Sequence, residues 1–275
     1  MIKLRYYNSL GDVVFDRDNW HLTEAEGLSV PTKSISAARY INQPGQCTTY
    51  CIENPRTITL SGDINIARID GEKFGKACSV LAKEGILCVE TDFYTRQIGA
   101  RCIEFVPGER NGDYRCFVMQ FLCDVPFFED VDFTEAVIYE RKPLLSKDTV
   151  LPAVFSTRVA KGSVYYNGNA YAEPEFYVKI PSGEGTLTVI NHTTGGRLSV
   201  RYSKDEFSHL VIDVKNRTIT DENGVSRLDF LTDDSFFDGF ILQYGENQLE
   251  VINSDVANDI GTRMRYKIRY QEAIV

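Results

Sequence analysis

The sequence predicts a mainly β protein in two parts: an α+β first half with one helix, and an all-β second half folded as a sandwich. Alternation of apolar and polar residues with a period of two recurs along most of the chain, which is typical of strands. Only the segment from Asp70 to Gly85 carries a helical pattern with start and stop signals. All seven cysteines lie at or before Cys123, and this uneven distribution indicates two separately built domains.

The stretch from Tyr114 to Asp130 is expected to join the two domains. It begins as an alternating strand and reaches Pro126, which cannot donate a hydrogen bond to a sheet, so the strand should end before it. Two phenylalanines follow the proline at once and need a pocket to fill. We therefore predict domains at residues 1–132 and 133–275. In the alternating strand, one predicted face carries Tyr114, Cys116, Val118 and Gln120, and the other carries Arg115, Phe117, Met119 and Phe121.

The first domain is predicted to be a mostly antiparallel sheet. Short connections at residues 94–96 and 107–113 are typical of hairpins. Residues 39–55 show little periodicity and several Asn, Pro and Gly residues, which predict a long loop. A loop of that length in a compact domain usually has a function or serves as an interaction arm. Strands are expected at residues 2–6, 13–15, 21–30, 56–66, 86–93, 97–106 and 114–121.

One helix is predicted in the first domain. Asp70 is a suitable N-cap, and Gly85 stands where a C-cap glycine belongs. A single apolar stripe indicates that the helix lies on a sheet. The stripe consists of Phe74, Ala77, Cys78 and Leu81.

The second domain shows strand signals throughout. Turn sequences rich in glycine and asparagine separate short alternating segments at intervals of roughly 8 to 12 residues, which predicts a sandwich or jelly roll. Strands are expected at residues 175–180, 186–191, 197–202, 209–214, 240–243, 248–252 and 263–270.

Composition argues against several classes of partner. The net charge is −9 and no basic stripe is present, so we expect no specific contact with DNA or RNA. No apolar run has the length of a membrane span, and the first residues form an alternating strand instead of a signal peptide. We therefore expect no membrane contact, synthesis in the cytosol and reduced cysteines.

The sequence contains no recognisable catalytic or metal-binding motif. His21, His192 and His209 lack the paired spacing of metal or nucleophile sites, and no G-x-S-x-G nucleophile is present. Cys47 and Cys51 form a C-x3-C pair without a second pair at ligand spacing. We therefore predict that the protein is not an enzyme and has no catalytic, cofactor-binding or metal-binding residues and no cofactor.

Several weak signals in a fixed order span nearly the whole chain. Together they resemble the distal tail protein (Dit) family, also called the siphovirus tail component, of bacteriophages with long non-contractile tails. The segments that carry the resemblance are Asn54–Gly62, Cys123–Phe128, Glu173–Ile180, Asn191–Gly195, Leu210–Asp213, the turn Asn223–Gly224 and Gln243–Leu249.

The resemblance implies a structural protein of a phage or prophage. The first domain would be a belt that assembles into a ring, expected to be a hexamer, and the second a galectin-like β-sandwich. The ring would join the tail tube protein to the baseplate or tip, to the tail-associated lysin and to receptor-binding or fibre proteins, with a central channel for DNA. The protein would then lie in the virion at the tail tip after synthesis in the bacterial cytoplasm. An exposed edge strand together with residues 39–55 is the expected ring contact.

A carbohydrate-binding module for host cell-wall polysaccharide is the alternative function. Aromatic rings of lectin sites lie under the apolar face of a sugar, and the only tryptophan, Trp20, belongs to the other domain. Tyrosines of the second domain would have to take this role, although such residues also fill sandwich rims and protein contacts. The candidates are Tyr165, Tyr166 and Tyr171 for stacking, and His192, Arg197 and Arg201 for polar contacts.

A hydrolase that uses Asp233 and Asp234 is the third hypothesis. Adjacent residues on a strand point to opposite faces, so such a pair would be badly placed for acid and base catalysis.

Overall fold

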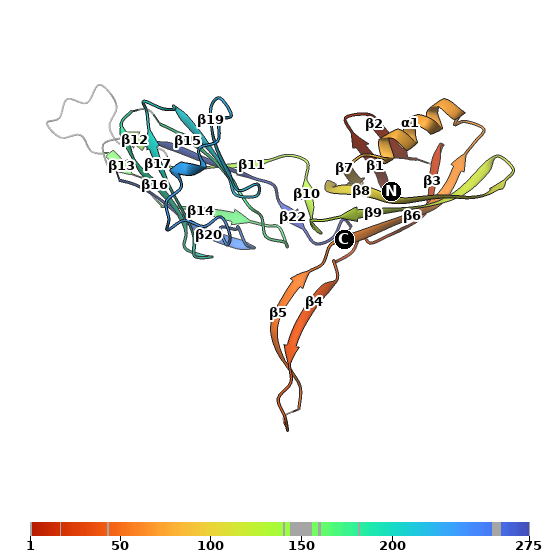
Figure 1. The fold of residues 1–275 in the computed structure, drawn as a ribbon, viewed down its shortest axis with the longest axis horizontal. Coiled ribbons are helices and arrows are strands. Elements are labelled where there is room, and N and C mark those ends of the chain that lie inside the picture. Colours follow the sequence, from red (N-terminus) through yellow and green to blue (C-terminus); the bar gives the residue numbers. More distant parts are fainter. Residues whose placement is uncertain are drawn as a thin grey trace. The chain divides into compact units, whose positions relative to one another are not determined.

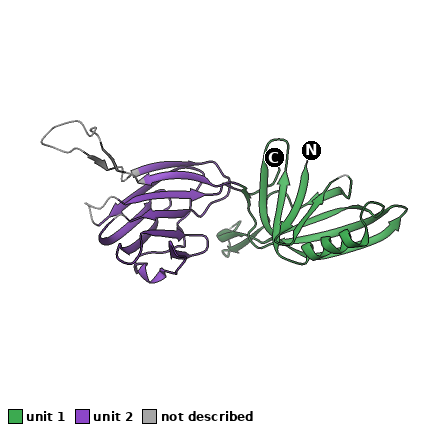
Figure 2. Cartoon of the chain, turned by 90° about the horizontal axis from the view of Figure 1, so that it is seen from above, with its two compact units in different colours: residues 1–131, 270–275 green, residues 132–269 purple. Residues whose placement is uncertain are grey.

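The computed structural model of the 275-residue chain describes residues 2–16, 18–42, 44–139, 141–143, 156–158, 161–180, 182–254 and 260–274. It separates into two compact units (Figure 2). Unit 1 comprises Met1–Val131 and Tyr270–Val275, and unit 2 comprises Asp132–Arg269. The first domain was expected to end one residue later, and the last residues were assigned to the second domain. In the structure the chain returns to unit 1 at Tyr270.

Unit 1 is built on one large sheet (Figure 1). Its main path runs in the order β2-β1-β7-β8-β9-β6-β3, and all neighbours are antiparallel. Two short strands extend it, because β10 pairs with β8 and β22 pairs with β10. The strands are β1 (Lys3–Asn8), β2 (Gly11–Phe15), β3 (Trp20–Glu26), β6 (Arg56–Asn65), β7 (Gly85–Glu90), β8 (Thr95–Asn111), β9 (Tyr114–Cys123), β10 (Phe128–Asp130) and β22 (Arg269–Tyr270).

The predicted helix is confirmed as α1 (Gly71–Leu81). The Asp70 side chain accepts a hydrogen bond from the backbone N–H of Lys73 at 2.8 Å, as an N-cap does. The buried side of α1 contributes Ala77, Val80 and Leu81 to the core of unit 1.

The end of α1 differs from the prediction. Ala82 is the C-cap residue, and its N–H donates to the carbonyl of Cys78. Gly85 is instead the first residue of β7. A Cβ atom at Gly85 would lie 2.5 Å from the carbonyl oxygen of Tyr7, so this glycine allows two strands to approach closely.

The predicted faces of β9 are confirmed, because Phe117, Met119 and Phe121 are buried in the core of unit 1. The connection between β8 and β9 is shorter than predicted. Pairing continues to Asn111 and Tyr114, so the turn is made by Gly112 and Asp113 alone. Gly112 has a φ of 61°, in the left-handed region that glycine adopts readily.

The prediction of a loop at residues 39–55 is wrong for residues 47–53, which form a strand. Strand β5 (Cys47–Glu53) pairs with β4 (Lys33–Ala38) to form a separate two-stranded ribbon. Figure 1 shows this ribbon leaving the main sheet of unit 1. We call β4, β5 and the described residues between them the arm.

Unit 2 is a β-sandwich of a five-stranded sheet in the order β11-β21-β15-β18-β19 and a four-stranded sheet in the order β14-β20-β16-β17. Buried side chains of both sheets form one hydrophobic core. The mainly β fold class is therefore confirmed. The elements are β11 (Thr134–Tyr139), β12 (Arg141–Pro143), β13 (Ser156–Arg158), β14 (Lys161–Tyr166), β15 (Glu175–Lys179), β16 (Glu184–Asn191), β17 (Gly196–Ser203), β18 (His209–Asp213), β19 (Thr218–Asp221), the 3-10 helix η1 (Leu228–Phe230), β20 (Gly245–Asn253) and β21 (Gly261–Tyr266).

One predicted strand of unit 2 is wrong. Residues 240–243 form no strand, and only Leu242 makes an isolated bridge, to Ala172. Phe240 and Leu242 are both fully buried, so their apolar character reflects packing of a loop into the core. Five strands of unit 2 were not predicted, namely β11, β12, β13, β14 and β19.

Candidate assembly site

Both faces of the arm are exposed. Every residue of β4 is exposed, and so is every residue of β5 except its last. Ile52 and Tyr50 lie on one face, opposite Ser34 and Ser36, while Ile35 lies on the other. An isolated two-stranded ribbon is marginally stable in water, and clustered exposed apolar side chains mark interaction surfaces. The large exposed apolar residues of the arm are Ile35, Tyr40, Ile41, Tyr50 and Ile52, with Ile41 90% exposed.

The base of the arm is held by polar contacts. Lys33 and Glu53 form an ion pair of 3.1 Å across the two strands. The Ser34 hydroxyl donates to the Asn54 side chain at 2.7 Å, and the Asn54 N–H donates to the carbonyl of Thr32 at 2.9 Å. These contacts join the two ends of the arm to each other where it meets the rest of unit 1.

Arg56, the first residue of β6, binds four backbone carbonyls in three other parts of unit 1. It is 4% exposed. Its Nε donates to the carbonyl of Pro126 at 2.9 Å, and its Nη1 donates to the carbonyls of Gly27 at 2.7 Å and Ser29 at 2.5 Å. Its Nη2 donates to the carbonyl of Gln271. Burial lowers the pKa of this guanidinium. One side chain thus fixes the entry to the arm, the end of β9 and the C-terminal segment.

A second arginine also holds the C-terminal segment. The guanidinium of Arg96 lies between the rings of Tyr94 and Tyr270, 4.3 Å and 3.6 Å from their centroids. Its Nη1 donates to the carbonyl of Glu272 at 2.6 Å. The sequence placed Arg96 in the predicted connection at residues 94–96, which is wrong for this residue: Arg96 lies in β8, where it pairs with Val89.

The carbohydrate candidates do not form one site. Tyr166 is fully buried, where its hydroxyl donates to the carbonyl of Ala170 at 2.7 Å and accepts from the N–H of Arg269 at 2.8 Å. Tyr165 and Tyr171 are exposed, but the ring that lies against Tyr165 is that of Tyr244, which was not a candidate.

The three polar candidates already have partners in unit 2. Ion pairs or hydrogen bonds join His192 Nε2 to Glu250 at 2.7 Å, Arg197 to the carboxylate of Asp234 at 2.7 Å, and Arg201 to the carbonyl of Asp229 at 2.8 Å.

The hydrolase hypothesis placed Asp233 and Asp234 on a strand, which is wrong. Both lie in a turn of the segment beside β17. Asp234 accepts from the Thr232 hydroxyl at 2.5 Å and pairs with Arg197, and both contacts lower its pKa. A carboxylate held in its ionised form in this way is unsuited to donate a proton.

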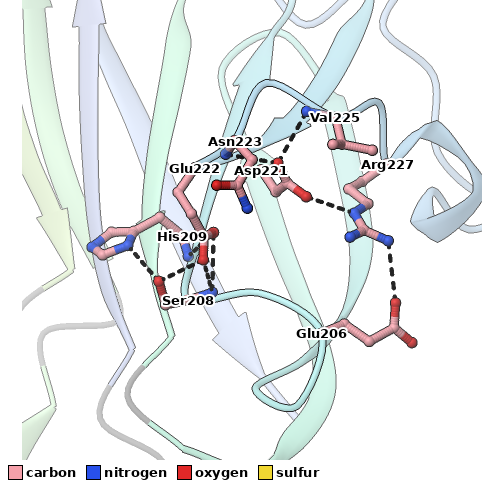
Figure 3. Close-up of polar contacts among 8 residues, drawn as sticks. All are labelled: Glu206, Ser208, His209, Asp221, Glu222, Asn223, Val225 and Arg227. Atoms are coloured by element: carbon pink, nitrogen blue, oxygen red, sulfur yellow. Dashed lines mark hydrogen bonds and ion pairs between the residues drawn. The ribbon is translucent and has the colours of Figure 1, made fainter.

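A network of carboxylates fixes the turn after β19 (Figure 3). The Asp221 carboxylate accepts from the backbone N–H groups of Asn223 and Val225, at 2.9 and 3.0 Å, and from Nε of Arg227 at 3.0 Å. Arg227 also pairs with Glu206 at 3.3 Å. The hydrogen bonds and the arginine lower the pKa of Asp221 against its desolvation.

Glu222 binds the start of β18 in the same network (Figure 3). Its carboxylate accepts from the N–H of Ser208 at 3.0 Å, from the Ser208 hydroxyl at 2.9 Å and from the N–H of His209 at 3.1 Å. Hydrogen bonds from the backbone and from Ser208 lower the pKa of Glu222 to about 2. These hydrogen bonds join the turn after β19 to the start of β18.

The described part of the chain holds no group of three or more His, Cys, Asp or Glu side chains arranged to bind a metal ion. In the same residues no helix combines the length and apolar composition needed to cross a membrane.

The two units, the sandwich and the exposed arm define the class of protein: a mainly β protein of two compact units with an exposed two-stranded ribbon. Residues 167–270 match the family model described as "Siphovirus-type tail component, C-terminal domain". The resemblance to phage distal tail proteins is thereby confirmed, with this match lying in unit 2 and extending by one residue beyond it.

Two solved structures of phage proteins share the fold of this chain. The Dit protein (gp 19.1) of phage SPP1 matches with a TM-score of 0.70 at 12% identity, over 98% of this chain and 99% of that one. A chain of the phage P2 baseplate, in its activated conformation with calcium, matches with a TM-score of 0.51 at 10% identity over the whole of both chains. At these identities the likeness is one of fold. No curated protein sequence matches the chain.

Proposed function

We propose that this protein is a structural hub of a phage tail, a ring that joins the tail tube to the baseplate or tip. The observation that carries the proposal is the correspondence over 98% of the chain with SPP1 Dit, which is described as a paradigm of the hub adsorption apparatus of phages that infect Gram-positive bacteria. The family match of residues 167–270 supports the same role independently.

The ring is built through a head-to-tail interface, in which the arm of one copy contacts a different surface of the next. Strand β3 is the last strand on the main path of the sheet, so one of its edges is available for pairing. Glu24 and Glu26 are exposed on this strand, and Arg39 is exposed on the arm. Backbone pairing and opposite charges therefore favour contact between the arm and the edge of β3 in a second copy.

The remaining parts of the proposal follow from this role. The ring encloses a channel for DNA and contacts the tail tube protein, the tail-associated lysin or tip, and receptor-binding or fibre proteins. It is made in the bacterial cytoplasm and resides at the tail tip of the virion, without enzyme activity. Each expected contact is checked by mixing the purified proteins in pairs and measuring complex formation.

Light scattering coupled to size-exclusion chromatography tests ring formation. The full chain should form an oligomer, expected to be a hexamer, as its concentration rises. The triple variant Ile35→Ser, Tyr50→Ser, Ile52→Ser should remain monomeric, because it removes the exposed apolar side chains of the arm. A matched control, Phe236→Ser, changes an exposed aromatic residue of unit 2 and should assemble normally. A chain that stays monomeric at high concentration, with and without the tail tube protein, would contradict the hub.

A further inference from the structure

Tyr165 and Tyr244 form an exposed aromatic pair in unit 2. Their ring centroids are 6.3 Å apart with an angle of 66° between the planes. Tyr165 is 65% exposed and Tyr244 is 68% exposed, although both are large rings that proteins usually bury at least in part. Nothing in the core of the sandwich requires them at these positions.

Hydrogen bonds from the buried side chain of Asn247 fix the backbone on both sides of Tyr244. Asn247 is fully buried, and its side-chain amide donates to the carbonyls of Gln243 at 2.8 Å and Gly245 at 3.2 Å. Its side-chain oxygen accepts from the N–H of Gln243 at 3.1 Å. The turn therefore holds Tyr244 in place without any ligand, which reduces the entropy that binding would cost.

Tyr165 is presented by strand β14. Pairing of β14 with β20 places Tyr165 opposite Glu246. The neighbouring Tyr166 is anchored in the core, so the alternation of the strand directs Tyr165 away from it. Ser163 and Gln248 form the next outward-facing pair on the same two strands.

We propose that this surface binds an uncharged saccharide chain. The C–H face of a sugar ring packs on an exposed tyrosine, and the carboxylate of Glu246 and the amide of Gln248 lie on the same face, where they accept and donate hydrogen bonds to sugar hydroxyls. This inference goes beyond the hub role, since ring assembly uses unit 1.

The charges near the pair favour a neutral ligand. Glu246 adds a negative charge beside the rings, and the chain as a whole carries −9, so phosphate-rich or other anionic polymers are repelled. Lys161 is the first residue of β14, four positions before Tyr165, whereas Arg197 and Arg201 stand on β17 at the opposite edge of the same sheet. Three strand spacings, about 14 Å, separate that edge from Tyr165, and both arginines already have acidic or carbonyl partners.

Affinity gel electrophoresis of the full chain tests the proposal with three neutral probes: dextran, galactomannan and a mixed-linkage β-glucan. At least one probe should retard the wild-type protein, and Tyr165→Ala and Tyr244→Ala should each weaken that binding by about tenfold or more. Phe236→Ala is the matched control, because Phe236 is as exposed as the two tyrosines, at 67%, but lies away from them. Its backbone N–H donates to the carbonyl of Arg197, at the opposite edge of the sheet. Thermal melts should show that all variants remain folded.

Three results would overturn the proposal. The first is no retardation by any of the three probes. The second is retardation that both tyrosine variants retain. The third is loss of assembly or of binding to another tail protein in Tyr165→Ala and Tyr244→Ala without loss of saccharide binding, which would assign the pair to a protein contact. Because oligomerisation is measured separately, failure here leaves the hub proposal standing.

Discussion

The guanidinium of Arg56 lies over the ring of Phe128, with its central carbon 4.8 Å from the ring centroid. The edge of the guanidinium binds backbone carbonyls while its face packs on an aromatic ring, an arrangement that lysine cannot reproduce. Phe128 belongs to the core of unit 1 and is the second of the two phenylalanines that follow Pro126. Both phenylalanines were expected to fill a pocket, and both Phe127 and Phe128 are buried.

Arg56→Met should strongly destabilise unit 1. It removes the donors for four carbonyls, including those of Pro126 and Gln271, and leaves buried acceptors without partners. We expect a loss of about 3 kcal/mol or more in the free energy of unfolding. Fluorescence during urea denaturation measures this, because the only tryptophan, Trp20, is buried in unit 1.

Arg68→Met is the control for Arg56→Met. Arg68 is an exposed arginine of the same unit, and it pairs with Asp18 at 2.6 Å on the surface. The substitution Arg68→Met should lower the free energy of unfolding by about 1 kcal/mol or less. Equal effects of the two substitutions would show that the buried network around Arg56 contributes no special stability.

Removal of residues 270–275 should destabilise unit 1 and leave unit 2 unchanged. The truncation removes the carbonyls of Gln271 and Glu272, which Arg56 and Arg96 bind. It also removes the hydrogen bond from the N–H of Ala273 to the carbonyl of Leu28, at 2.8 Å. The tryptophan transition should shift to lower urea concentration.

Glu272→Gln provides the control for this truncation, because it removes only the charge that pairs with Arg96 at 3.7 Å and keeps all the backbone contacts, so it should shift the transition less. Hydrogen exchange with mass spectrometry should show faster exchange after truncation in unit 1 alone. A tryptophan transition that does not move would mean that the C-terminal segment adds nothing to unit 1.

Unit 2 should lose stability in acid through Glu222. Its folded pKa is about 2 and its ordinary value is 4.5, so the ionised form favours the folded state. This contribution is present in full above pH 4.5 and is lost as the pH falls towards 2. Glu222→Gln should therefore be less stable than the wild type at pH 7, and the difference should shrink between pH 4.5 and pH 2.

Urea denaturation followed by circular dichroism at several pH values measures the effect of Glu222→Gln. The exposed Glu184→Gln, also in unit 2, serves as the control and should show little difference at any pH. A gap between wild type and Glu222→Gln that stays constant down to pH 2 would be inconsistent with a depressed pKa.

The cysteines should differ sharply in reactivity. Burial raises the pKa of Cys123 to about 12, so its thiol is protonated and shielded at neutral pH. Cys47 and Cys51 are exposed on the arm. Brief treatment of the native monomer with iodoacetamide should label these two and spare Cys123, as measured by peptide mass spectrometry.

Assembly should protect the arm cysteines. Because we propose that the arm lies in the interface between copies, labelling of Cys47 and Cys51 should slow in the oligomer. Cys116, exposed on β9, is the internal reference outside the arm. Unchanged labelling of the arm in a verified ring would place the interface elsewhere.

Features that depend on local chemistry were predictable. Asp70 caps α1 because a carboxylate next to free N–H groups stabilises a helix start wherever the helix packs. The buried face of β9 follows from strand alternation, since a sheet with one face on a core requires apolar side chains at every second position. The strand at residues 47–53 was not predicted, because β5 belongs to a ribbon with both faces exposed and therefore shows no alternation of apolar and polar residues.

Contacts between distant parts of the chain could not be predicted from local sequence, because only the tertiary structure brings these residues together. Arg56 and Gln271 are 215 residues apart, and no local pattern links an arginine to the carbonyl that it binds. The same holds for Tyr165 and Tyr244, which meet because β14 pairs with β20. Local sequence sets which side of each strand is apolar, whereas strand order and register set which side chains become neighbours. The binding of the C-terminal segment to unit 1 and the exposed tyrosine pair therefore depend on the tertiary structure.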